Sequence, residues 1–343
     1  MGGPARQDDH LQLLAGACGD VAAEADNDLA ISPGALMKVL LTGAAGQLGQ
    51  ALMAALPQQL AGQTVQLIAT SRSGDDGLIA LDLADGEACR AAVLTHRPDW
   101  VLNAGAYTAV DKAESEPELA MAVNGGAPRA FAQALQELGQ GQLLQVSTDF
   151  VFNGSQGRPY APDQPRQPLG VYGASKAAGE EAVEELLGAG RGVILRTSWV
   201  YGPVGHNFCR TMLRLHRERP QISVVADQVG CPTSTTGLAA ACWRVLERTA
   251  EPQQALPQVL HWSDAGAASW FDFAVAIGEL GVSTGLLEQA AEVHPIRTTD
   301  YPTPAQRPSY SLLECTASRK TLGLAPRHWR QALQAVLSIT RQG

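Results

Sequence analysis

KVLLTGAAGQLG, residues 38–49, joins a short apolar run to three glycines, Gly43, Gly46 and Gly49, at a spacing of three residues. The apolar run predicts a buried parallel strand, and the glycines predict a tight turn that opens a helix. Backbone N–H groups at such a helix N-terminus bind a pyrophosphate, and glycine is needed where a Cβ would block the phosphates or the packing of helix on strand. The pattern alone is weak in a chain with 35 glycines, but its place between strand and helix predicts a dinucleotide site.

Four more strand-like runs follow this unit and alternate with amphipathic stretches of helix length. This order predicts an α/β protein with right-handed crossovers and a Rossmann-like, doubly wound parallel sheet. The expected strands are residues 38–43, 64–70, 100–106, 142–148 and 191–200, and the expected helices are residues 48–56, 117–138 and 172–187.

The regular alternation ends near Pro203, after which proline-containing loops separate scattered helices. We therefore expect an NAD(P)-binding Rossmann domain over residues 37–203 and a smaller C-terminal substrate domain over residues 204–343. A segment near residues 222–240 is the candidate to return to the sheet.

Residues 1–36 contain no aromatic side chain and carry six acidic residues against one basic residue, Arg6, which gives this segment a net charge of −5. We expect an N-terminal extension that either precedes a natural start at Met37 or is disordered. A regulatory arm is the alternative.

The composition excludes several classes of protein. Hydrophobic residues make up 45% of the chain and charged residues 17%, which is enough apolar surface for folded cores. A net charge of −9 disfavours a nucleic-acid or anionic-membrane partner. No apolar run is long enough to span a membrane and no signal peptide is recognised, so we expect a cytoplasmic protein that acts on small molecules. The six cysteines and seven histidines are dispersed, so we predict reduced thiols and no metal site.

The end of the second strand favours NADPH over NADH. An acidic residue there usually binds the ribose hydroxyls of NAD, whereas arginine accommodates a 2′-phosphate. The chain has Ser71 and Arg72 at this place, although Asp75 or Asp76 could still supply the acid. The next strand ends place Asp82 and Leu83, and then Ala104 and Gly105, where further cofactor contacts fall in such folds.

Tyr172 and Lys176 form a Tyr-x-x-x-Lys pair at the start of a predicted helix, so their side chains share one face. A neighbouring ammonium favours the ionised form of a phenol, and we expect Lys176 to lower the pKa of Tyr172. Thr148 ends a predicted strand at the sheet edge where doubly wound folds bind ligands. Its hydroxyl could stabilise the alkoxide that forms when a hydride reduces a ketone. A strand-end threonine that satisfies the backbone is the alternative.

Seven motifs resemble the extended short-chain dehydrogenase/reductase superfamily and, within it, the dTDP-4-dehydrorhamnose reductase family. They are GAAGQLG, RPDWVLNAGAYTAVDKAESEPELAMAVN, STDFVFNG, PLGVYGASKAAGE, RTSWVYGPVGHNF, DQVGCPTSTTGLA and YPTPAQRPSYSLL, and they span roughly residues 38–340. The resemblance implies that Tyr172 is the proton donor, that Lys176 binds the nicotinamide ribose and that Thr148 tunes the substrate oxygen. It implies sugar contacts at Thr148, Asp149 and Trp199, with Asn207 and Arg307 as candidates for the sugar or diphosphate. The cofactor positions that it implies are Gly46, Gln47, Leu48, Asp82, Leu83, Ala104, Ala106, Tyr107 and Thr108.

The implied activity is the NAD(P)H-dependent reduction of the C4 ketone of dTDP-4-dehydro-β-L-rhamnose to dTDP-β-L-rhamnose, for surface polysaccharide. Reduction of another dTDP-4-keto-6-deoxyhexose is one alternative, and a non-catalytic regulatory subunit, as for methionine adenosyltransferase, is another. Some relatives dimerise through magnesium held by a glutamate on the first helix, where this chain has Gln50 and Ala51. A magnesium-bridged dimer is therefore doubtful, and the choice between monomer and homodimer stays open.

Overall fold

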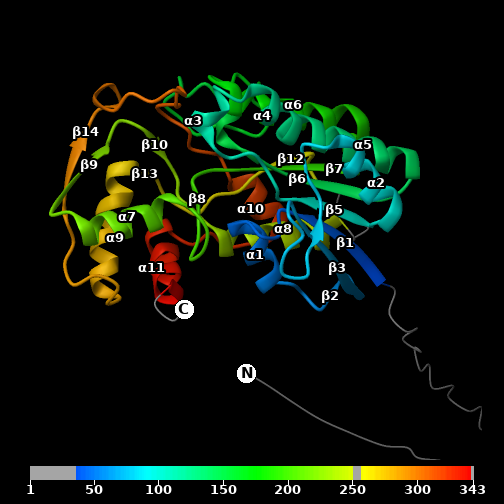
Figure 1. Cartoon of the computed structure of the whole chain (residues 1–343), viewed down its shortest axis with the longest axis horizontal. Coiled ribbons are helices and arrows are strands. Elements are labelled where there is room, and N and C mark those ends of the chain that lie inside the picture. Colours follow the sequence, from blue (N-terminus) through cyan, green and yellow to red (C-terminus); the bar gives the residue numbers. More distant parts are fainter. Residues whose placement is uncertain (1–35, 250–255, 341–343) are drawn as a thin grey trace, which may run out of the picture. The chain divides into compact units, whose positions relative to one another are not determined.

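The computed structural model describes residues 36–249 and 256–340, so most of the expected N-terminal extension lies outside the described residues. Within this part of the chain, eight strands form one sheet in the order β12-β7-β6-β5-β1-β3, with β2 and β4 both paired to β3 (Figure 1). Every pairing in the sheet is parallel except that of β2 with β3. The strands are β1 (Leu36–Thr42), β2 (Gln59–Leu60), β3 (Gln63–Ser71), β4 (Ile79–Ala80), β5 (Trp100–Asn103), β6 (Gln142–Thr148), β7 (Gly192–Thr197) and β12 (Val259–His261).

The winding of the sheet reverses at β1, which lies between β3 and β5. Val39 pairs with Leu67 on one side and with Trp100 on the other. In doubly wound sheets, ligands bind outside the carboxyl ends of the strands at such a reversal. The expected fold class is confirmed, and the position of the ligand cleft follows from it.

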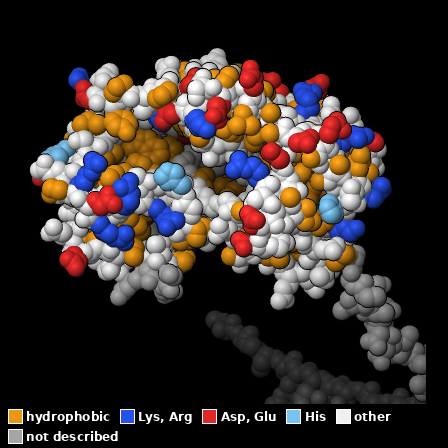
Figure 2. Space-filling view, viewed as in Figure 1, with side chains coloured by type: hydrophobic (Ala, Val, Ile, Leu, Met, Phe, Trp, Pro, Cys, Tyr) orange, Lys and Arg blue, Asp and Glu red, His pale blue; other side chains and the backbone are white. Residues whose placement is uncertain are grey.

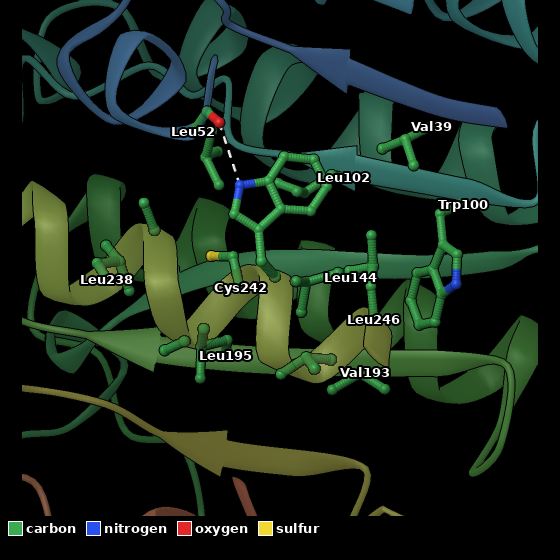
Figure 3. Packing of buried hydrophobic residues seen from close by; sticks show 14 of the residues in the cluster. Val39, Leu52, Trp100, Leu102, Leu144, Val193, Leu195, Leu238, Cys242 and Leu246 are labelled. Atoms are coloured by element: carbon green, nitrogen blue, oxygen red, sulfur yellow. Dashed lines mark hydrogen bonds between the residues drawn. The ribbon is translucent and has the colours of Figure 1, made fainter. Parts of the chain in front are cut away.

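Helices cover both faces of the sheet. On one face lie α1 (Gln47–Ala54) and α8 (Thr235–Thr249), whose apolar side chains Leu52 and Leu238 pack with those of the strands (Figure 3). The indole of Trp243 on α8 donates a 3.1 Å hydrogen bond to the carbonyl of Leu52 on α1. On the other face lie α2 (Gly86–His96), α5 (Ala127–Leu138) and α6 (Val171–Leu187).

The expected helix at 117–138 is interrupted. It consists of α4 (Pro117–Met121), a π-helical turn over Ala122–Gly126, and α5. Asn124 lies in this turn, and its buried side chain bonds outside its own helix, to Tyr107 and Ser175. A single extra residue in a helical turn often marks a functional region, which periodicity does not predict.

A second group of elements has its own core. It contains α7 (Phe208–Glu218), α9 (Trp270–Ser283), α11 (Trp329–Thr340) and the parallel pair β9 (Gln221–Val225) and β14 (Glu292–Ile296). The remaining elements are α3 (Val110–Ala113), β8 (Val200–Tyr201), β10 (Val229–Gly230), β11 (Thr233–Ser234), β13 (Ala268–Ser269) and α10 (Thr316–Leu322).

The later half of the chain contributes to both groups. Within the described residues, no strand of the 222–240 segment pairs with the large sheet; β9 pairs with β14, and the strand that returns to the sheet is β12, at residues 259–261. Apart from this correction, the division at residues 203 and 204 stays a prediction. None of the described helices is both long and apolar enough to cross a membrane.

Candidate active site

One cleft of about 970 Å³ lies at the carboxyl ends of β1, β3, β5 and β6. In Figure 2, a hollow with hydrophobic side chains lies over the region of β8, β10 and β13. Every candidate site residue selected from the sequence lines this cleft: Gly43, Gly46, Gln47, Leu48, Gly49, Ser71, Arg72, Asp82, Leu83, Ala104, Gly105, Ala106, Tyr107, Thr108, Thr148, Asp149, Tyr172, Lys176, Trp199, Asn207 and Arg307.

The glycine loop between β1 and α1 is packed too closely for side chains at two of its positions. A Cβ on Gly49 would lie 2.2 Å from the carbonyl oxygen of Gly43. A Cβ on Gly43, whose φ is +68°, would lie 2.6 Å from the Cα of Gly105 in the loop after β5. The loop therefore brings its own backbone, rather than side chains, to the start of α1, as an anion site at a helix N-terminus requires.

The end of β3 presents one cation to the cleft. Arg72 is exposed there, while the hydroxyl of Ser71 accepts a 3.0 Å hydrogen bond from the backbone of Gly74. Asp75 and Asp76 do not line this cleft. Arg72 is therefore the charged side chain that lines the cleft directly after this strand.

Asn124 ties the loop after β5 to α6, although nothing in the sequence singled it out. Its side-chain oxygen accepts a 2.9 Å hydrogen bond from the backbone N–H of Tyr107, and its amide donates to the carbonyl of Tyr107 and the hydroxyl of Ser175, each at 3.0 Å. Ser175 stands directly before Lys176 on α6. The π-helical turn thus fixes the loop of residues 104–108 relative to the helix that carries Tyr172 and Lys176.

The side chains of Thr148, Asp149 and Tyr172 meet where β6 ends. The Thr148 hydroxyl donates a 3.1 Å hydrogen bond to Oδ1 of Asp149 and accepts one of 3.2 Å from the backbone N–H of Phe150. It also lies near the phenol of Tyr172, whose pKa it lowers. The ring of Tyr172 also packs edge-to-face on Phe150, with centroids 5.5 Å apart. The phenol is therefore held beside a hydroxyl at the sheet edge.

The expected effect of Lys176 on Tyr172 is wrong for this structure. Burial raises the pKa of Tyr172 to about 12, the Thr148 hydroxyl opposes this shift, and the Asp149 charge adds to it. Burial also lowers the pKa of Lys176 to about 8, against the effect of Glu180 one turn further along α6. The Lys176 ammonium donates a 2.7 Å hydrogen bond to the carbonyl of Val146, so its N–H is directed to the backbone. The effect of desolvation on the pKa of Tyr172 outweighs the effect of charge that the helical spacing predicted, and the phenol keeps its proton at neutral pH.

Asp149 is a buried carboxyl group, only 1% exposed. Burial raises its pKa to about 6, and the hydroxyls of Ser311 and Thr148 oppose that shift. Within the part of the chain that the structure describes, its Oδ2 atom has no hydrogen bond of ordinary geometry. This unpaired oxygen is itself buried, which adds to the cost of the ionised carboxylate.

Trp199 has an unusual backbone conformation and an aromatic partner. Its φ is +48°, and its indole is stacked on that of Trp270 with centroids 3.5 Å apart and an interplanar angle of 6°. Trp270 also lines the cleft. Trp270 could not be recognised as a cleft residue from the sequence, because in SWFDFAVAIGEL it is only one position of an amphipathic helix.

Asn207 and Arg307 already have protein partners. Asn207 is the N-cap of α7, where its side chain accepts from the backbone of Arg210 and donates to Gln47 on α1 at 3.2 Å. Arg307 forms a bidentate ion pair with Asp111 of α3, with N–O distances of 3.0 and 2.7 Å. Asn207 therefore links α7 to α1, and Arg307 links the segment after β14 to α3.

Gln50, at the place where the resemblance implies a magnesium-binding glutamate, is bonded to the backbone of its own chain. The amide of Gln50 on α1 donates a 2.9 Å hydrogen bond to the carbonyl of Ala45. No group of three or more His, Cys, Asp or Glu side chains that could hold a metal ion occurs in residues 36–249 and 256–340. The doubt about a magnesium-bridged dimer stays a prediction.

A family model, curated relatives and solved structures each match most of the chain. The family model for the RmlD substrate binding domain matches residues 37–342. The dTDP-4-dehydrorhamnose reductase of Streptomyces griseus is 43% identical over 304 residues, which are 88% of this chain and 94% of that protein. The solved dTDP-4-dehydrorhamnose reductase of Clostridium acetobutylicum matches with a TM-score of 0.77 at 34% identity, covering 89% of this chain and 100% of that one. The Bacillus anthracis enzyme, solved in complex with NADP, matches with a TM-score of 0.74 at 33% identity, covering 88% and 98%.

Proposed function

The chain belongs to the dTDP-4-dehydrorhamnose reductase family, and we propose that it reduces the C4 ketone of dTDP-4-dehydro-β-L-rhamnose to dTDP-β-L-rhamnose with NADPH. The product would serve the synthesis of surface polysaccharide. We also propose that it works in the cytoplasm, where reduced nicotinamide cofactors are available.

The residues of the nucleotide-binding half fit a dinucleotide phosphate. The backbone of the loop from Gly43 to Gly49 would hold the pyrophosphate at the start of α1. Glycine at positions 43 and 49 allows this loop to pack closely on its own backbone and on Gly105. Arg72 would bind the 2′-phosphate at the end of β3, which supports NADPH over NADH. Bound in this way, NADPH would supply the hydride.

The observation that carries the proposal is that Tyr172, Thr148 and Lys176 line the same cleft as the glycine loop. A phenol whose pKa is about 12 is protonated at neutral pH. Tyr172 therefore holds a proton that it can give to the more basic alkoxide that forms at C4. The Thr148 hydroxyl, which donates to Asp149 in the structure, would turn to donate to the same oxygen and so stabilise its developing negative charge.

Lys176 and Asp149 complete the set of groups around the reacting centre. The Lys176 ammonium is buried at the cleft and would bind the ribose hydroxyls on the nicotinamide side. Asp149, which lines the cleft, would accept a hydrogen bond from a hydroxyl of the hexose. Trp199 would provide an apolar wall for the sugar ring, and Arg307, fixed by Asp111, would lie near the diphosphate.

A coupled assay tests the proposal. An epimerase generates the 4-keto sugar substrate in situ from its keto-sugar precursor, and the protein is then added. Loss of NADPH and of NADH is followed in separate reactions. Formation of dTDP-rhamnose with faster loss of NADPH is the expected result. Binding of NADPH without turnover would contradict the proposed reaction and would favour another nucleotide sugar or the regulatory-subunit alternative.

A further inference from the structure

The backbone of Trp199 lies in a region that side chains rarely adopt. The residue follows β7 and its φ is +48°, which for a bulky aromatic residue is an unfavourable conformation. Such a conformation persists only where the surroundings determine it, and it is typical of ligand sites. The contacts around the indole of Trp199 therefore need to account for its position.

Two contacts hold that indole. One of its faces is covered by Trp270, at a centroid distance of 3.5 Å and an angle of 6°. Its other face lies against Gly230, where a Cβ would come within 2.6 Å of the ring-fusion atom Cε2 and 2.8 Å of Nε1 of the indole. No positive φ requires glycine at position 230, so the close approach of the indole is the reason for glycine there.

Gly230 and Trp270 are themselves carried by one small framework. β10, which ends at Gly230, pairs antiparallel with β13, and Trp270 is the first residue of α9 directly after β13. A capping box between Ser269 and Asp272 fixes the start of this helix. The far side of Trp270 packs on Phe208, with centroids 4.6 Å apart.

We propose that Trp270 and Gly230 are positioning residues that hold the Trp199 indole between them in one orientation, so that the part of the ring that lines the cleft meets the hexose. This inference rests on the proposed function, because it assumes a sugar at Trp199. It adds two residues that act on the sugar through Trp199. Fixing a binding surface in advance favours one orientation of a flexible ligand and avoids the cost of ordering it on binding.

Kinetics of single and double variants test the proposal. Trp270→Leu and Gly230→Ala should each raise KM for the nucleotide sugar about tenfold, with a smaller change in kcat and an unchanged Kd for NADPH. Trp270→Phe should restore KM to within about threefold, since it keeps an aromatic face. Phe271→Leu, at the next position of α9 and outside the cleft lining, is the matched control and should leave KM unchanged.

A double-mutant cycle separates positioning from a merely structural role. If Trp270 acts through Trp199, Trp270→Leu should have no further effect on KM in the Trp199→Ala background. Additive effects of the two substitutions would overturn the proposal.

Circular dichroism gives a readout independent of activity. Two indoles stacked this closely couple their transitions, so the far-ultraviolet spectrum should show an exciton couplet. Trp199→Phe and Trp270→Leu should each abolish the couplet, and Phe271→Leu should keep it. Loss of the couplet in Trp270→Leu with unchanged KM would overturn the proposal and leave the proposed function intact. If the wild-type protein shows the couplet but does not turn over the nucleotide sugar, the proposed function is contradicted. The proposed role of Trp270 and Gly230 in holding Trp199 for the sugar is then contradicted as well.

Discussion

Arg196 on β7 holds Glu180 on α6 through two donors, Nε at 2.9 Å from Oε1 and Nη2 at 2.7 Å from Oε2. Both side chains are buried, at 2% and 0% exposure, and Arg166 adds a third donor to the same carboxylate at 2.6 Å. Glu180 lies one turn after Lys176, whose pKa it raises. The pair thus anchors α6, the helix that carries Tyr172 and Lys176, to the sheet.

Glu180→Gln should destabilise the fold by about 3–5 kcal/mol, because it leaves the buried Arg196 without a counter-charge. The free energy of unfolding in urea measures the effect. Glu185 lies on α6 like Glu180, and its exposed carboxylate forms an ion pair with Arg129 of α5. Glu185→Gln is therefore the matched control and should cost less than about 1 kcal/mol. Equal losses in the two variants would contradict the anchoring role.

Tyr172→Phe should lower kcat by about 10² to 10⁴ while NADPH binding is largely kept, since the substitution removes only the hydroxyl that gives the proton. The rate of NADPH oxidation and a fluorescence titration of the cofactor measure the two effects. Tyr301→Phe, at a side chain 60% exposed and outside the cleft lining, serves as the control. More than half of wild-type activity in Tyr172→Phe would exclude Tyr172 as the proton donor.

Arg72→Ala should weaken NADPH binding and spare NADH. The loss should be about 1.5–3 kcal/mol, the value of a hydrogen bond to a charged group, or roughly 10- to 150-fold in Kd. Titration of both cofactors against the variant and against Arg214→Ala, at an exposed site on α7, measures it. An unchanged preference for NADPH would assign the 2′-phosphate to another residue of this loop.

Asp149 should make stability depend on pH. Its pKa of about 6 lies above the value of roughly 3.9 for an exposed aspartate, so the folded protein binds the proton more tightly than the unfolded chain between these values. Its contribution is fully present below about pH 4 and is lost as the pH rises through about 6.

Asp149→Asn removes this titration. Relative to wild type, the variant should therefore gain up to about 3 kcal/mol of unfolding free energy between pH 4 and pH 7. Urea unfolding without ligands, at a series of pH values, measures the difference. Asp163→Asn, at an exposed position, is the control, because it also removes one carboxylate but not a buried one. A constant difference between wild type and Asp149→Asn would contradict the raised pKa.

Local patterns predicted most of the sheet and the residues of the cleft. The strand at β1, the glycine loop and the Tyr172–Lys176 pair are all encoded within a few consecutive residues, so periodicity and spacing indicate them directly. The stack of Trp199 on Trp270 and the bonds of Asn124 join residues far apart in the chain, which no local pattern predicts.

The raised pKa of Tyr172 was missed for a related reason. Spacing along a helix predicts that Lys176 is near, but the pKa depends on how much water reaches both groups, and that is set by the packing of α6 on the sheet. Burial is a property of the whole fold, and here it outweighs the neighbouring charge.

The strand at one edge of the sheet, β12, consists of residues 259–261. The helix α8, which covers one face of the sheet, consists of residues 235–249. During synthesis from the N-terminus, β7 and the apolar surface under α8 are therefore made long before the segments that cover them. A nascent chain at this stage presents an open strand edge, to which other strands can pair. Protection by a chaperone should matter most while the ribosome translates the segment between β7 and β12.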